Sequence, residues 1–242
     1  MISEQFLTAE WRDLAMLNYE IDSAILRSYV PAGTELDTWN GKTYCSMVGF
    51  RFLSTRVLRV AIPFHTDFEE VNLRFYVRHK SAEGWRRGVV FIKEIVPRRA
   101  VAVIARRLYN ENYVALPMRH RIDLADGKLC PGGAVEYGWR SGRAWHRLTA
   151  RTDGPPAPAA AGSDAEFITE HYWGYASQAD GGCVEYRVEH PSWNVWAAPA
   201  AKLECDAEAL YGASFAEALR AQPTSAFAAD GSAVRVYTGC RL

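Results

Sequence analysis

The chain has 242 residues and carries 28 basic and 28 acidic side chains, which cancel. A neutral chain gives no electrostatic reason to expect a nucleic acid or an anionic membrane as partner. No apolar run reaches the roughly 20 residues that span a bilayer, and the N-terminal segment carries acids where a secretory signal would be basic. We therefore expect a cytoplasmic protein of one domain, residues 1–242, with no nucleic-acid or membrane partner.

The reactive side chains show none of the common short motifs. The five cysteines are widely spaced and none forms a Cys-x-x-Cys pair, which predicts reduced, mostly buried thiols and no zinc site. The six histidines lack the helical pairing of zinc proteases, and the chain has no Gly-x-Ser-x-Gly elbow or phosphate-binding glycine loop. We expect neither a metal nor a cofactor.

Short strands are predicted along the first hundred residues. An entry strand is expected within residues 1–20, and a short capped helix within residues 22–29. A turn at Asn40–Gly41 leads into a strand at residues 43–52. Further strands are predicted at residues 68–77 and 88–96.

One strong helix interrupts this pattern. Val101, Ile104, Ala105 and Leu108 recur at helical spacing, which predicts a helix over residues 99–109. Beyond it we expect strands at residues 118–124, 134–140, 144–151, 167–175, 183–189 and 234–240, and a second helix, opened by a capping box of Ser214 and Glu217, that ends near residue 221. Many short strands with few helices indicate an α+β, mainly β fold, such as a closed or sandwiched barrel.

The strand predicted at residues 68–77 has two chemically distinct faces. Its apolar face carries Val71, Leu73, Phe75 and Val77. Its polar face carries Glu70, Asn72, Arg74 and Tyr76. Strict alternation is typical of a strand with one buried side. The polar face either contacts water, as in many antiparallel sheets, or lines a cavity.

Four motifs along the chain carry a family resemblance. They are Glu70-x-Asn72-x-Arg74-x-Tyr76-Val77, a helix end Ala105-Arg106-Arg107-Leu108-Tyr109 followed by Tyr113, Glu170-His171-Tyr172-x-x-Tyr175, and His190-Pro191-x-Trp193. In this order they resemble the uncharacterised bacterial YqjF-like family, whose members are similar to acetoacetate decarboxylase in fold. The resemblance implies a curved, barrel-like sheet that encloses a pocket, with a few helices outside, and no settled activity. It favours the cavity for the polar face.

The resemblance also bears on catalysis by lysine. Acetoacetate decarboxylase works through a lysine that forms a Schiff base with a β-keto acid. The resemblance puts Tyr113 at that position, and a phenol cannot form an imine. Lys93 shares a predicted strand side with Val89 and Phe91, where burial would lower its pKa. Alternatively, Lys93 lies at a strand edge with its ammonium group in water.

Two functions remain open, and so does whether the protein is an enzyme. In the first, the pocket binds a small organic acid or a related anionic metabolite, with a guanidinium group on its carboxylate. In the second, the protein is a lyase or hydrolase acting on a keto or enol acid, with Glu70 as acid/base, Tyr113 as proton donor and no Schiff base. The expected ligand-binding residues are Asn72, Arg74, Tyr76, Lys93, Arg106 and His190. A homo-oligomer is compatible with either.

Overall fold

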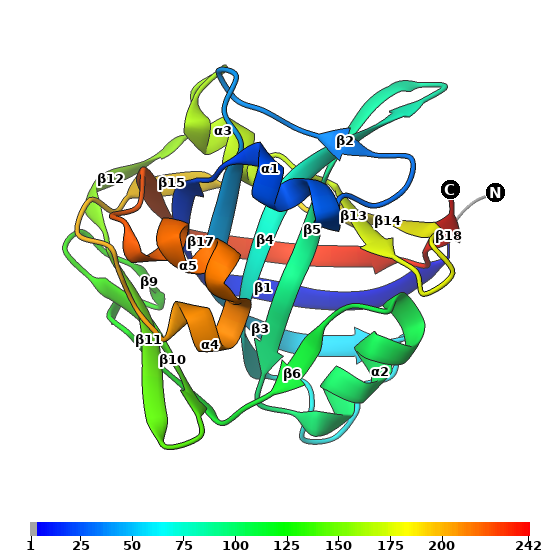
Figure 1. Ribbon diagram of the computed structural model, residues 1–242. Coiled ribbons are helices and arrows are strands. Elements are labelled where there is room, and N and C mark those ends of the chain that lie inside the picture. The colour runs from blue at the N-terminus through cyan, green and yellow to red at the C-terminus, as the bar shows by residue number, and fades with distance from the viewer. Residues whose placement is uncertain (1–3) are drawn as a thin grey trace.

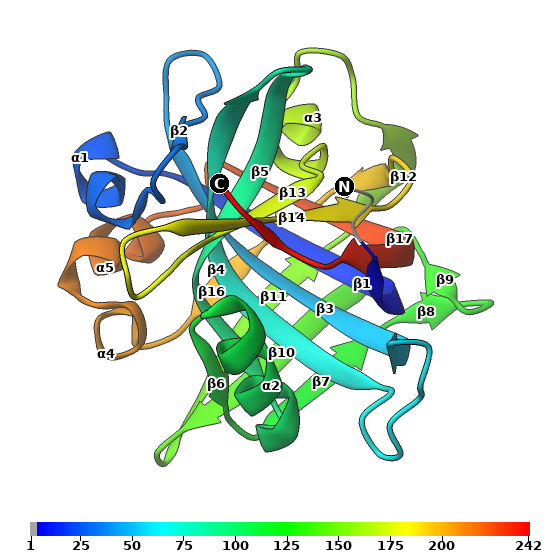
Figure 2. The same ribbon diagram turned by 90° about the vertical axis from the view of Figure 1, so that its right-hand side faces the viewer.

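The computed structural model describes residues 4–242, apart from the side chains at positions 105 and 107–109. Within these residues, seven strands of the main sheet close into a barrel (Figure 2). They follow the order β17 (Ser225–Tyr237), β1 (Gln5–Glu20), β3 (Tyr44–Val57), β4 (Phe68–Ser81), β5 (Gly84–Val96), β13 (Trp173–Ser177) and β14 (Cys183–Glu189). The ring closes where β14 pairs with β17. The predicted α+β, mainly β fold with a barrel is confirmed.

Smaller elements extend and cover the barrel. Five short strands join the main sheet: β2 (Glu35–Leu36), β6 (Tyr113–Ala115), β12 (Asp153–Pro158), β15 (Asn194–Ala197) and β18 (Cys240–Arg241). A second sheet contains β16 (Lys202–Glu204), β11 (Ala144–Arg151), β10 (Ala134–Ser141) and β7 (Met118–Ile122), and β8 (Leu124–Ala125) pairs with β9 (Lys128–Leu129). The helical segments are α1 (Ser23–Leu26), the 3-10 turn η1 (Arg27–Tyr29), α2 (Arg99–Tyr109), α3 (Asp164–Thr169), α4 (Ala207–Tyr211) and α5 (Ala213–Arg220). No helix in the described part of the chain is long and apolar enough to cross a bilayer.

The barrel wall separates two apolar cores. Outside it, Leu73 and Met47 pack with side chains of the second sheet such as Trp139, and with Phe215 of α5. Figure 1 shows α4 and α5 beside β10 and β11 on this side. The second core contains Phe50 and other residues of β3, β4 and β5 that point the opposite way. Because strand side chains alternate, one set of strands supplies both cores.

The local predictions have mixed outcomes. The helix at Arg99–Tyr109 is confirmed, and so is the Asn40–Gly41 turn, where both residues have positive φ. The strand predicted at 167–175 is wrong at its start, because residues 164–169 form α3, capped by Ser163, and the strand begins at 173. The capping box at Ser214 is also wrong, since α5 begins one residue earlier and has no side-chain cap.

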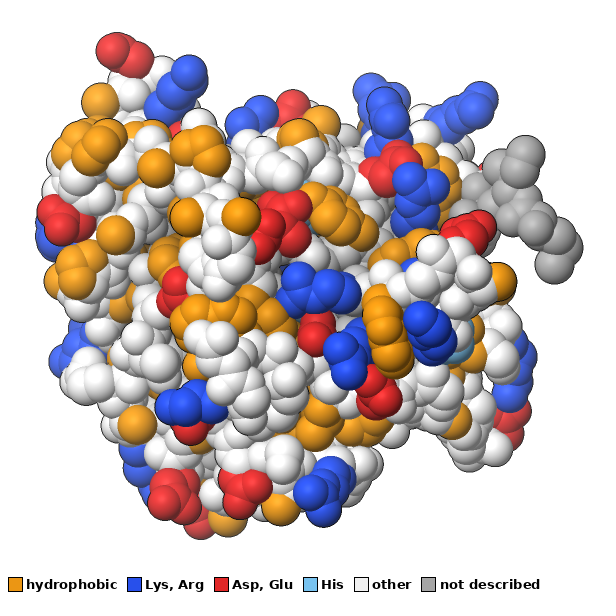
Figure 3. Space-filling view, turned by 90° about the horizontal axis from the view of Figure 1, so that it is seen from above, with side chains coloured by type: hydrophobic (Ala, Val, Ile, Leu, Met, Phe, Trp, Pro, Cys, Tyr) orange, Lys and Arg blue, Asp and Glu red, His pale blue; other side chains and the backbone are white. Residues whose placement is uncertain are grey.

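The surface carries both signs of charge. On the face drawn in Figure 3, acidic and basic side chains are interspersed among hydrophobic ones. Such mixing agrees with the zero net charge of the whole chain.

Candidate functional site

The polar face of β4 lines a cavity inside the barrel. Glu70, Asn72 and Arg74 all border this space, which measures about 210 Å³. The alternate residues Leu73 and Phe75 are fully buried in the outer core. The alternation therefore separates cavity from core here: three of the four side chains on the polar face of β4 line the cavity, and the fourth, Tyr76, does not.

A β-bulge in β5 decides which of its residues face the same cavity. Arg74 pairs with Phe91, but the preceding residue of β4 pairs with Lys93, which leaves Ile92 as an extra residue. A bulge reverses the inward and outward alternation beyond it. Phe91 and Glu94 therefore both line the cavity, whereas Lys93 points to the outer side.

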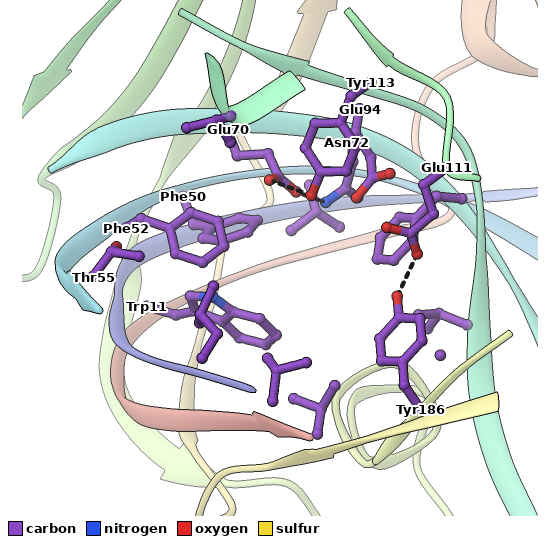
Figure 4. A pocket seen from close by; sticks show the side chains of 18 of the residues that line it. Trp11, Phe50, Phe52, Thr55, Glu70, Asn72, Glu94, Glu111, Tyr113 and Tyr186 are labelled. Atoms are coloured by element: carbon purple, nitrogen blue, oxygen red, sulfur yellow. Dashed lines mark hydrogen bonds between the residues drawn. The ribbon is translucent and has the colours of Figure 1, made fainter. Parts of the chain in front are cut away.

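Three glutamates meet at one end of the cavity (Figure 4). Glu70 comes from β4, Glu94 from β5, and Glu111 from the segment that follows α2. Tyr113 Oη donates a hydrogen bond to Glu70 Oε2 at 3.2 Å. Tyr186 Oη donates to Glu111 Oε1 at 2.5 Å. We call Glu70, Glu94 and Glu111 the acidic cluster.

Burial makes these three carboxyl groups weak acids. It raises the pKa of Glu70 to about 7, although hydrogen bonds from Asn72 and Tyr113 act in the opposite direction. Burial likewise raises the pKa of Glu111 to about 7, and burial together with the neighbouring carboxylates raises that of Glu94 well above its usual value. Near neutral pH the acidic cluster can thus both donate and accept protons.

The rest of the cavity wall is largely apolar and aromatic. Its aromatic members are Phe6, Trp11, Phe50, Phe52, Phe68, Phe91, Trp173 and Trp193, besides Tyr113 and Tyr186. Ile62, in the loop between β3 and β4, and Ile104 of α2 both line the cavity while 37% and 40% exposed. Two lining side chains that also reach solvent place the opening between this loop and α2.

Arg74 and three histidines, His65, His171 and His190, line the cavity as well. Arg74 Nη2 donates to the Ile168 carbonyl at 3.2 Å, and its buried Nε has no hydrogen-bond partner among the described residues. Burial lowers the pKa of His171 to about 4 and also lowers that of His190, so both rings are neutral at pH 7. His190 stacks on Trp193 with ring centroids 4.2 Å apart. Arg74 is the one arginine or lysine among the described residues that lines the cavity.

Five of the eight predicted site residues line this cavity: Glu70, Asn72, Arg74, Tyr113 and His190. The other three predicted residues, Tyr76, Lys93 and Arg106, do not line it.

Tyr76 is buried in the apolar packing, and its hydroxyl lies 2.6 Å from Ser46 Oγ. Lys93 Nζ donates to the Leu210 carbonyl on the outer side of the barrel. Arg106 is exposed, and its Nε donates to the Ala102 carbonyl of its own helix at 3.2 Å.

Several lining residues were not predicted from the sequence, among them Glu94, Glu111, Tyr186 and His171. Glu94 was missed because strict alternation was assumed across the bulge. Glu111 and Tyr186 meet only because the chain folds them together, across 75 positions. His171 belongs to one of the family motifs, and that motif was the only available signal for it.

Among the described residues, no group of three or more His, Cys, Asp or Glu side chains is placed to hold a metal ion. No lysine of the described chain lines the cavity either.

Solved structures confirm the predicted fold. Acetoacetate decarboxylase from Legionella pneumophila superposes on this chain with a TM-score of 0.67 at 14% identity. The match covers 99% of this chain and 88% of the decarboxylase chain. The enduracididine biosynthesis enzyme MppR complexed with pyruvate gives 0.70 at 12% identity, covering 100% and 91%. An acetoacetate decarboxylase-like enzyme from Sphingomonas wittichii RW1 gives 0.66 at 15% identity, covering 99% and 94%. At these identities the likeness shows the fold alone.

Sequence comparison confirms the predicted family. The uncharacterized protein YqjF of Bacillus subtilis (strain 168) is 32% identical over 128 residues, which is 52% of this chain and 48% of that protein. The chain thus matches about half the length of this relative. The family model DUF2071, described as an uncharacterized conserved protein (COG2071), matches residues 8–233. The chain therefore belongs to the DUF2071 family.

Proposed function

We propose that this protein binds a small organic acid in the barrel cavity. The apolar part of the ligand lies against the aromatic wall, and its carboxylate lies against Arg74. The observation that carries this proposal is that Arg74 lines the same largely apolar cavity as the aromatic side chains.

The aromatic wall supplies affinity and Arg74 supplies orientation. Small-molecule sites are typically apolar hollows with a few convergent polar groups. Burying apolar ligand surface is favourable by about 25 cal/mol per Å². The partnerless Nε of Arg74 is a donor that a carboxylate can satisfy with a charge-assisted hydrogen bond. MppR, one of the proteins with this fold, was solved with pyruvate, which is an organic acid.

Titration calorimetry tests the proposal with a panel of keto, hydroxy and arylacetic acids. We expect at least one acid to bind, and Arg74→Ala to weaken binding by about 10- to 100-fold, as expected for the loss of a charge-assisted hydrogen bond. Arg78→Ala is the matched control, because Arg78 lies on the same strand but is paired with Glu35 outside the cavity. Absence of binding across the panel, or equal effects of the two variants, would contradict the proposal.

A second candidate is acid–base catalysis on a keto or enol acid. Glu70, whose pKa is raised to about 7, matches the requirement for a group that exchanges protons near neutral pH. Tyr113, bonded to it at 3.2 Å, is a neutral proton donor because burial raises the pKa of the phenol. Turnover of a β-keto or enol acid that is lost in Glu70→Gln, with binding retained, would favour this candidate. Tight binding without turnover would favour simple binding.

A further inference from the structure

The cavity holds more acidic than basic groups. Glu70, Glu94 and Glu111 line it, and Arg74 is the one arginine or lysine of the described residues that does so. The proposed carboxylate of the ligand uses Arg74. Arg74 also acts electrostatically on Glu70, and no other arginine or lysine of the described residues lines the cavity beside the acidic cluster.

Asn72 lies beside this cluster, and one of its side-chain atoms has no hydrogen-bond partner among the described residues. Its side chain is 2% exposed, and its Nδ2 donates to Glu70 Oε1 at 2.9 Å. That bond fixes the orientation of the amide, and Asn72 Oδ1 has no partner among the described residues. Glu94 pairs with Asn72 across the strands, and its Oε2 has no partner there either. Buried polar atoms without a hydrogen-bond partner are rare and unfavourable.

Two unpartnered oxygen atoms on paired residues, beside three carboxyl groups, define the chemistry that fits them. A hydroxyl group offers a single donor. Water offers two donors but no charge. A protonated amine offers up to three donors and a positive charge. Because no group of three acidic, histidine or cysteine side chains in the described chain is placed for a metal ion, an organic cation fits better than a metal.

We propose that the ligand carries a protonated amino group, which inserts between Asn72 and Glu94 and is held by the acidic cluster. The ligand is then an amine-bearing organic acid with an apolar body. This inference rests on the proposed function, since it concerns the other end of the same ligand.

The strand geometry sets the distance between the two charges. Asn72 and Arg74 are two residues apart on β4, so their Cα atoms lie about 7 Å from each other. They project from the same side of the strand into the cavity. A compact apolar unit, such as a benzene ring, is therefore expected between the amino and carboxylate groups.

The direction of proton exchange between the protein and the solvent on ligand binding reports the sign of the charge that enters the acidic cluster. The titratable and charged groups that line the cavity with the cluster are Arg74, Tyr113, Tyr186, His65, His171 and His190. Since the carboxyl groups are partly protonated near pH 7, an arriving cation lowers their pKa values and releases protons. An arriving anion would instead raise these pKa values and take protons up.

Two isosteric probes test the proposal by titration calorimetry at pH 7, in buffers of different ionisation enthalpy. They are para-(aminomethyl)phenylacetate and para-ethylphenylacetate, which differ only in an ammonium against a methyl group. We expect the amino compound to bind about tenfold or more tightly, in line with a charge-assisted hydrogen bond, and to release protons.

Matched variants locate the effect. Glu94→Gln keeps the size of the side chain and removes its charge, so it is expected to abolish most of the advantage of the amino compound and to spare the ethyl compound. If Glu94→Gln does not fold, Glu111→Gln replaces it, and this variant is also expected to reduce the affinity advantage of the amino compound. Glu69→Gln is the control, because Glu69 is adjacent to Glu70 on β4 but bonds His120 instead of lining the cavity. It is expected to leave both affinities unchanged.

The outcomes separate this inference from the proposed function. One outcome is that the ethyl compound binds and the amino compound binds equally or more weakly, or takes up protons. The proposed amino group of the ligand is then wrong, and the proposed binding of an organic acid stands. If neither acid binds but para-propylbenzylamine does, the amine stands and the role of Arg74 is wrong. If none of the three binds, both proposals are wrong.

Discussion

Glu70 gives the strongest prediction about stability, because a buried carboxyl group with a raised pKa destabilises the fold once it ionises. The side chain is 2% exposed, and burial raises its pKa from 4.5 to about 7. We therefore consider Glu70→Gln, which keeps the shape of the side chain and cannot ionise.

The magnitude follows from the shift. Below pH 4.5 the carboxyl group is protonated in both the folded and the unfolded chain, and ionisation has no effect on stability. Between pH 4.5 and about 7 only the unfolded chain loses the proton, so the stability of the wild type falls as pH rises. The difference between a pKa of 4.5 in the unfolded chain and about 7 in the folded chain corresponds to about 3 kcal/mol at and above pH 8. The Glu70→Gln variant lacks this loss.

Urea unfolding at pH 5 and pH 8 measures the effect. Relative to wild type, we expect Glu70→Gln to gain about 2 to 3 kcal/mol between the two pH values. Glu69→Gln is the control: a hydrogen bond from His120 lowers the pKa of Glu69, so its contribution is present at high pH and is lost as pH falls. Parallel pH profiles for wild type and Glu70→Gln would refute the reasoning.

Two further substitutions probe the cavity wall and its outer side. Gly174→Ala would place a Cβ 2.1 Å from Tyr186 Cζ, so the ring must shift, which disturbs its hydrogen bond to Glu111. We expect a loss of about 1–3 kcal/mol in urea unfolding, as for overpacking, and weaker ligand binding. An unchanged variant would contradict this packing. Lys93→Met is expected to leave ligand binding unchanged in calorimetry, because Lys93 points to the outer side. For the same reason borohydride with a β-keto acid should leave Lys93 of the wild type unlabelled, and a labelled Lys93 would show that its placement is wrong.

The sequence predicted which strand face lines the cavity better than it predicted the complete set of lining residues. The alternation in β4 was sufficient to assign Glu70, Asn72 and Arg74 to one face, because the period of a regular strand is two. The same rule failed in β5, where the bulge at Ile92 reverses the alternation, so Lys93 was placed inward and Glu94 was overlooked. A bulge leaves no clear mark in a single apolar strand sequence.

Other parts of the site depend on contacts between distant segments. Glu111 follows α2 and acquires its role only when Tyr186 of β14 is folded over Gly174. No local pattern encodes that meeting. Residues 164–169 illustrate a different limit, since a helix of six residues has too few turns to show a helical period.

The most direct test of the account is a crystal structure of the protein grown with para-ethylphenylacetate. We predict density for the acid inside the barrel, with its carboxylate within hydrogen-bond distance of Arg74 and its ring against Trp11 and Phe50. A structure in which Glu70, Asn72 and Arg74 point into bulk solvent while apolar side chains fill the barrel would contradict the account.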